Sequence, residues 1–152
     1  MTVPFRNVEF DPISPLDEWP AEAIDTVMDR GTLSDWRRLA DEIRRDPWGP
    51  VARTVQTISS WGEHYGVDAL MARVISQARD EVDLRGRAVY AEQIRSWRKQ
   101  AGMTLRQLAR AAGTSASRLS EYENAKVAPT TDVLGRIHHI ATAHRTRAGD
   151  PS

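Results

Sequence analysis

Apolar side chains recur at helical spacing along most of the chain, and no segment shows the alternation typical of a strand. Between residues 21 and 82 this pattern predicts about four helices. Ser34 is expected to cap the second helix, and Asp46 followed by Pro47 is expected to start the third. These helices would form a small bundle. Residues 1–20, which contain four prolines, would form an irregular arm before it.

Further along the chain, two short helices joined by a tight turn are predicted. Thr104 and the glutamine three residues later match a capping box at the start of TLRQLARAA, and Gly113 is placed to end that helix. Ser115 can cap the next helix, ASRLSEYE, so the arrangement is that of a helix-turn-helix. This second helix has only Leu119 and Tyr122 as inward anchors. Its small, polar outer face suits the major groove of DNA.

The two parts of the chain meet near Arg85-Gly86-Arg87, where we place a domain boundary. An amphipathic helix is predicted on each side of it, one ending near residue 82 and one starting at Ala88. Because both flanks of Gly86 favour helix, a single continuous helix with a kink is the alternative. We therefore expect an all-α protein: an acidic N-terminal helical bundle over residues 1–84, followed by a helix-turn-helix domain over residues 85–147.

The formal net charge of zero conceals two opposite halves. Residues 1–84 contain nine basic and sixteen acidic side chains, a net charge of −7, whereas residues 85–152 contain twelve and five, a net charge of +7. A basic half indicates an anionic partner, most commonly a polynucleotide, although attraction between the two halves would also explain the asymmetry. The chain has no cysteine, no membrane-spanning apolar run and no signal-peptide pattern, so a cytoplasmic, nucleoid-associated location is expected.

The stretch RSWRKQAGMTLRQLARAAGTSASRLSEYENAKVAPTTDVLGRIHHIA closely resembles the Xre-type, lambda-repressor-like helix-turn-helix family of bacterial and phage regulators. The matching elements are AGMTxxxLA, the AGTS turn, YENxK and a later Pro-x-x-x-x-Leu, in register over about residues 88–142. The resemblance implies a compact domain of four or five helices whose third helix lies in the DNA major groove. The segment RRDPWGPVARTVQ also resembles the leading region of small actinobacterial regulators.

The resemblance also implies roles for individual residues. Contacts with base edges are implied for three residues of helix 115–123: Ala116, Ser117 and Glu121. Contacts with the DNA backbone are implied for six others: Thr104, Arg106, Ser115, Arg118, Asn124 and Lys126. Arg98 and Glu123 match a structural pair that joins the first helix to the end of the recognition helix. Ala125 departs from the family, which usually has glycine at this position, suited to a left-handed turn.

Arg118 and Glu121 each allow more than one role. Arg118 could be a solvated helix residue, but the motif and the neighbouring basic residues favour contact with DNA. Glu121 could accept a hydrogen bond from cytosine, repel misplaced phosphates or pair with a nearby arginine. The sequence favours none of these three roles of Glu121 over the rest.

Metal, cofactor and catalytic sites are not indicated. His138, His139 and His144 do not share one helical face and have no cysteine or carboxylate pair beside them, so solvent-facing histidines are the preferred interpretation. No nucleophile elbow, phosphate loop or zinc-protease motif is present. The five tryptophans lie mostly at core spacing in the N-terminal bundle, which favours packing. We expect a protein that is not an enzyme and needs no cofactor.

Two main hypotheses of function follow. The first is a sequence-specific transcriptional regulator, a repressor by preference, that binds double-stranded DNA as a homodimer on half-sites about one helical turn apart. The alternative is an antitoxin or adaptor: the bundle of residues 1–84 binds a toxin, an effector or another protein partner, and the C-terminal domain autoregulates its operon. A third possibility is that the acidic bundle folds back on the basic domain and inhibits it. None of the three involves a membrane.

Overall fold

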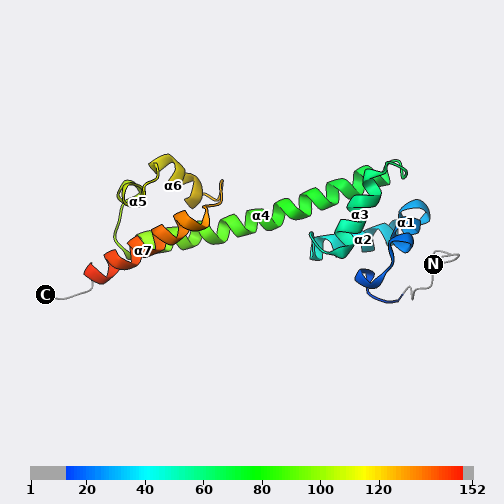
Figure 1. Cartoon of the computed structure of the whole chain (residues 1–152), viewed down its shortest axis with the longest axis horizontal. Coiled ribbons are helices and arrows are strands. Elements are labelled where there is room, and N and C mark those ends of the chain that lie inside the picture. The colour runs from blue at the N-terminus through cyan, green and yellow to red at the C-terminus, as the bar shows by residue number, and fades with distance from the viewer. Residues whose placement is uncertain (1–12, 149–152) are drawn as a thin grey trace. The chain divides into compact units, whose positions relative to one another are not determined.

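The computed structural model describes residues 13–148, so residues 1–12 of the predicted arm lie outside the described part of the chain. Within residues 13–148 every regular element is helical, which confirms the all-α prediction (Figure 1). A short 3-10 helix, η1 (Leu16–Glu18), precedes the α-helices. These are α1 (Ala21–Arg30), α2 (Leu33–Arg45), α3 (Pro50–Ser60), α4 (Val67–Gln100), α5 (Leu105–Ala112), α6 (Ala116–Glu123) and α7 (Thr131–Ala148). In this part of the chain no helix is both long and apolar enough to span a membrane.

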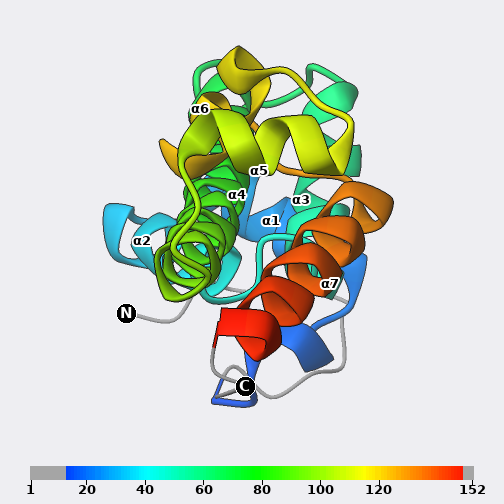
Figure 2. The same cartoon turned by 90° about the vertical axis from the view of Figure 1, so that its left-hand side faces the viewer.

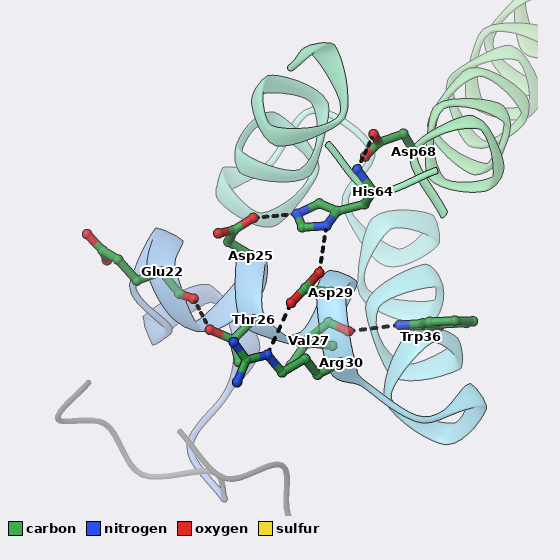
Figure 3. Close-up of polar contacts among 9 residues, drawn as sticks. All are labelled: Glu22, Asp25, Thr26, Val27, Asp29, Arg30, Trp36, His64 and Asp68. Atoms are coloured by element: carbon green, nitrogen blue, oxygen red, sulfur yellow. Dashed lines mark hydrogen bonds and ion pairs between the residues drawn. The ribbon is translucent and has the colours of Figure 1, made fainter. Parts of the chain in front are cut away.

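Two compact units make up the chain, and they divide between Glu81 and Val82. The first unit buries one face each of α1, α2, α3 and the N-terminal part of α4 in a single hydrophobic core. Its fully buried side chains include Ile24, Leu39 and Met71. A hydrogen bond also ties α2 to α1, because the indole Nε1 of Trp36 donates to the carbonyl of Val27 at 2.8 Å (Figure 3).

The start of α2 differs from the sequence prediction. Its N-cap is Thr32, two residues before the expected Ser34. The hydroxyl of Thr32 accepts from the backbone N–H of Asp35 at 3.3 Å, while the carboxylate of Asp35 accepts from the backbone N–H of Thr32 at 2.9 Å. This reciprocal capping box satisfies two otherwise unpaired N–H groups, whereas a cap at Ser34 would satisfy one.

The start of α3 is also displaced. Pro50, not Pro47, occupies the first helical position, and Gly49 is the N-cap. Asp46 closes α2 instead, as its C-cap, and its carbonyl accepts from the N–H of Gly49 at 3.0 Å. Residues 47–49 are therefore a turn. Both prolines suit a first helical position, and only the one that follows this turn begins the helix.

Helix α4 runs without interruption through the predicted boundary. Its 34 residues, Val67–Gln100, replace the two shorter helices expected on either side of Gly86. No heavy atom outside the helix lies within 4 Å of the point where a Cβ on Gly86 would be. Glycine inside a helix costs about 1 kcal/mol relative to alanine, and good helix formers on both sides outweigh this. The division between the two units therefore falls inside a helix.

The second unit has a separate core. Helices α5, α6 and α7 surround it together with the C-terminal part of α4 (Figures 1 and 2). Ile94, Leu108, Leu119 and Ile137 are fully buried there, one from each of the four helices. Helix α5 contacts both α6 and α7. Each helix of this unit thus contributes a large apolar side chain to one shared centre, which fixes the position of α6 relative to the others.

Several large apolar residues are exposed. Leu70 is 45% exposed and Val89 is 64% exposed. Trp48 and Trp61 are also exposed, at 45% and 55% of their surface. Core packing therefore explains only some of the tryptophans.

His64 lies in the connection between α3 and α4 and is buried in the first unit. Its Nε2 is 2.5 Å from Oδ1 of Asp25, and its Nδ1 is 3.5 Å from Oδ1 of Asp29, both on α1 (Figure 3). Its backbone N–H donates to Asp68 at the start of α4 at 2.9 Å. Burial opposes the charged ring, but the hydrogen bond and charge of Asp25, with the charges of Asp68 and Asp29, outweigh it and raise the pKa of His64.

Candidate nucleic-acid interface

The turn between α5 and α6 is defined by local interactions that the sequence predicts. Thr104 and Gln107 form the expected capping box: the Thr104 hydroxyl accepts from the Gln107 N–H at 3.1 Å, and the Gln107 side chain accepts from the Thr104 N–H at 2.8 Å. Gly113 ends α5 with a left-handed φ of 73°. The Ser115 hydroxyl then accepts from the N–H of Arg118 at 3.0 Å and caps α6. These three predictions are confirmed.

Helix α6 is anchored on one side only. Leu119 and Tyr122 are buried, at 0% and 5% exposure, and they point into the second core. Of the residues predicted to contact DNA, Thr104 and Arg106 lie at the start of α5, and the others lie on α6 or within a few residues of its ends. The exposed residues of this set are Thr104, Arg106, Ser115, Ser117, Arg118, Asn124 and Lys126, and the half-buried ones are Ala116 and Glu121. The outer face of α6 is therefore built of small and polar side chains, as the major groove requires.

Two of these residues are joined in the free protein. Nη1 of Arg118 donates to Oε2 of Glu121 at 3.1 Å, one helical turn further along. The guanidinium of Arg118 also lies over the ring of Tyr122, 5.9 Å from its centroid. The hydrogen bond that Arg118 donates to Glu121, followed by its interaction with Tyr122, raises the pKa of Arg118 above its already high ordinary value. Arg118 is thus held along the surface of α6.

Asn124 acts at the end of the helix. Its side-chain Nδ2 donates to the carbonyl of Ser120 at 2.8 Å, and its backbone N–H donates to the same carbonyl at 3.0 Å. These bonds satisfy a carbonyl in the last turn of α6. In this arrangement Asn124 closes the helix and also remains exposed.

Three arginines of α4 hold the C-terminal end of α6, and we call them the arginine clamp: Arg87, Arg95 and Arg98. Nε of Arg98 donates to the carboxylate of the buried Glu123 at 2.9 Å. Arg95 donates to the main-chain carbonyl of Glu123, and Nε of Arg87 donates to the carbonyl of Ala125 at 3.1 Å. The three positive charges therefore gather at the negative end of the helix dipole.

Ala125 adopts the left-handed conformation, with φ of 57°, and is the only non-glycine residue with positive φ between residues 13 and 148. The family that this segment resembles usually has glycine at this position, and the left-handed conformation of Ala125 is one that favours glycine. Alanine costs about 1 kcal/mol in this conformation. The hydrogen bond from Arg87 to the Ala125 carbonyl offsets this cost, since bonds that involve a charged donor contribute about 1.5–3 kcal/mol.

The sequence does not indicate the roles of Arg87 and Arg95 in the arginine clamp. Their partners are main-chain carbonyls 38 and 28 residues further along the chain, and a main-chain carbonyl leaves no trace in residue identity. Arg98 was found only because the resemblance supplied its partner. The single available signal for the other two is their placement: Arg87, Arg95 and Arg98 lie within about 80° of one another around α4.

Metal chemistry finds no support in the same region. Across residues 13–148, no group of three or more His, Asp or Glu side chains is arranged to hold a metal ion. His138 instead lies against Trp97, with ring centroids 4.6 Å apart, so it joins α7 to α4. The contact with Trp97 is thus a packing contact between these two helices.

Comparisons with known proteins agree with this geometry. Residues 94–140 match the family model described as Helix-turn-helix. No curated protein and no solved structure matched the chain. The matched segment comprises 47 of the 152 residues and contains α5, the turn and α6. Residues 94–140 are thus similar to a helix-turn-helix domain, a kind of domain that binds DNA in regulatory proteins.

Proposed function

We propose that this protein is a sequence-specific transcriptional repressor that reads the major groove of DNA with α6. One observation carries the proposal: an exposed helix face without large apolar side chains follows a capped helix and a glycine turn, inside a segment that matches the helix-turn-helix family. The residues proposed to contact base edges are Ala116, Ser117 and Glu121. Those proposed to contact the backbone are Thr104, Arg106, Ser115, Arg118, Asn124 and Lys126.

Dimerisation belongs to the same proposal. A single module of this size buries little DNA, and a homodimer on two half-sites about 34 Å apart would double the contact surface and the specificity. We propose that repression follows from occupancy of a promoter by this dimer.

Selection of bound duplexes from a random pool tests this function most directly. The expected result is a pair of related half-sites about one helical turn apart. Affinity for the selected duplex should fall steeply with salt, because lysine and arginine release counterions from DNA. Equal affinity for every duplex, or an affinity that does not change with salt, would contradict the proposal.

A second candidate function follows from the first unit. It has its own hydrophobic core, and it exposes Trp48, Trp61 and Tyr65, the last of which is fully exposed. Exposed aromatic residues are enriched at protein–protein interfaces. The alternative is therefore an antitoxin or adaptor that binds a protein partner through residues 1–84 and autoregulates its operon. A small protein encoded beside it, which co-purifies with the wild type but not with Trp61→Ser, would favour this alternative.

A further inference from the structure

The C-terminal end of α6 is the point at which the second unit sets the direction of this helix. The last carbonyls of any helix lack partners within it. In α6 the carbonyls of Glu123 and Ala125 receive hydrogen bonds from Arg95 and Arg87, both on α4. The end of α6 and the following turn are therefore bound to another helix through their main chain.

These contacts complement the buried pair of Arg98 and Glu123. The Glu123 side chain is 6% exposed, and the pair places one point of α6 against α4. Leu119 and Tyr122 hold the middle of α6 on the second core, and the Arg98–Glu123 pair adds a contact at its C-terminal end. Arg95 adds a second contact at Glu123, and Arg87 adds a third at Ala125, two residues beyond it. These three contacts restrict the angle at which the end of α6 lies against α4.

The angle of α6 decides which side chains reach which base edges. Ser117 and Glu121 are four residues apart, so a rotation of the helix moves them by different amounts relative to a groove. When the contacts that support a recognition surface are loose, its side chains no longer lie at the positions that distinguish similar ligands. Discrimination between the ligands is then lost before binding is lost. Non-specific contacts with phosphates depend much less on this angle, because phosphates line the whole groove.

We propose that Arg87 and Arg95 are positioning residues for sequence recognition. They hold α6 at the angle that matches its outer face to the bases, and they act through main-chain carbonyls without contacting DNA. This inference rests on the proposed function of α6 as the DNA-reading helix. It differs from a general role in stability, because the property that depends on Arg87 and Arg95 is discrimination between sequences.

The test uses the full chain and the variants Arg87→Gln and Arg95→Gln. Affinity is measured for the selected duplex and for a shuffled duplex over a series of salt concentrations. Each variant should bind the selected duplex about tenfold more weakly, change its affinity for the shuffled duplex less than about twofold, and keep the salt slope of the wild type. A smaller folded fraction would instead lower both affinities by the same factor.

Two matched variants calibrate the measurement. Arg106→Gln removes a proposed phosphate contact, so it should weaken both duplexes alike and reduce the salt slope by about 0.9. Lys99→Gln removes an exposed charge from α4, close to Arg95 in sequence but outside the clamp, and should leave discrimination unchanged. If Arg87→Gln and Arg95→Gln behave like Arg106→Gln, the two arginines contact phosphates and the inference is wrong. Unchanged discrimination in both variants overturns it as well.

Amide hydrogen exchange of the free protein separates this inference from the proposed function. The N–H of Lys126 donates to the carbonyl of Glu121 at 3.0 Å, just beyond the clamped carbonyls. Its exchange should be about tenfold faster in Arg87→Gln if the clamp orders this turn. If exchange is faster in Arg87→Gln but the wild type shows no preference for any duplex, the ordering role of the arginine clamp stands and the proposed function is wrong. Unchanged exchange would reject the clamp itself.

Discussion

Arg118 and Glu121 form an ion pair on the outer face of α6, with Nη1 3.1 Å from Oε2. The two side chains are 52% and 40% exposed, so water and salt screen the pair and it contributes little to stability. A phosphate that approaches α6 can therefore replace Glu121 as the partner of Arg118. Of the three roles that the sequence leaves open for Glu121, pairing with a neighbouring arginine is the one present in the free protein.

The substitution Glu121→Gln should release Arg118 and remove a negative charge from the interface. We expect affinity for all duplexes to rise, by about fivefold at about 0.1 M salt, because Arg118 no longer has to leave Glu121 to meet a phosphate, and we expect the salt slope to stay close to that of the wild type, because Arg118 meets a phosphate in both proteins. A filter-binding or fluorescence-anisotropy titration at several salt concentrations measures both. A loss of affinity confined to duplexes with cytosine at one position would show instead that Glu121 reads that base.

Two substitutions on the DNA-facing surface should have contrasting effects. Ser117→Ala should change the preferred base at one position of each half-site, by about 1 kcal/mol, because the role proposed for Ser117 is contact with a base edge. Lys126→Ala should weaken all duplexes by a similar factor and lower the salt slope. Repeating the duplex selection with both variants compares them directly. An unchanged consensus with Ser117→Ala would remove this residue from the set of base contacts.

The left-handed turn after α6 predicts an unusual stabilising substitution. Ala125→Gly should raise the free energy of unfolding of the second unit by about 0.5 kcal/mol, since relief of about 1 kcal/mol of strain is partly cancelled by the greater freedom of the unfolded glycine. Ala88→Gly, at an exposed and helical position of α4, is the control and should lower stability by about 1 kcal/mol. Urea denaturation followed by circular dichroism measures both. Equal destabilisation by the two substitutions would mean that Ala125 is not strained.

The stability of the first unit should depend on pH through His64. The folded protein raises the pKa of His64 above 6.5, its ordinary value in an unfolded chain, because the carboxylates of Asp25, Asp68 and Asp29 outweigh burial. The folded state therefore holds this proton more tightly. The resulting stabilisation is complete below about pH 6.5 and is lost as the pH rises through the folded-state pKa.

Tryptophan fluorescence measures this effect, because four of the five tryptophans belong to the first unit and only Trp97 to the second. The urea midpoint of the wild type should fall as the pH rises from about 6.5 through the folded-state pKa of His64. His64→Asn should lower the midpoint at about pH 6 and flatten its dependence on pH. If His64→Asn keeps the pH dependence of the wild type, another group is responsible for it.

Local signals in the sequence predicted local structure well. The capping box at Thr104, the glycine at 113 and the cap at Ser115 were all predictable, because each involves residues within a few positions of one another. The same kind of signal gave the wrong N-cap for α2, where two residues could have capped the helix. Thr32 replaced Ser34 because only Thr32 has a carboxylate three residues later that completes a reciprocal cap.

Contacts between distant residues were predictable only where two side chains meet. The pair of Arg98 and Glu123 was accessible through the resemblance, whereas Arg95 binds a main-chain carbonyl and was not. The contacts of His64 were not predicted either, although its partner is a side chain. Its partner Asp25 is 39 residues away, and no spacing rule connects them.

Because Arg87 and Arg95 bind main-chain carbonyls, the side chains on the outer face of α6 take no part in these two contacts. Ser117 and its neighbours can therefore be exchanged without loosening the end of the helix. In evolution, this separation would let related proteins acquire new operators by a few substitutions while the scaffold stays intact. For an engineer, it makes the second unit a frame on which new DNA specificities can be selected.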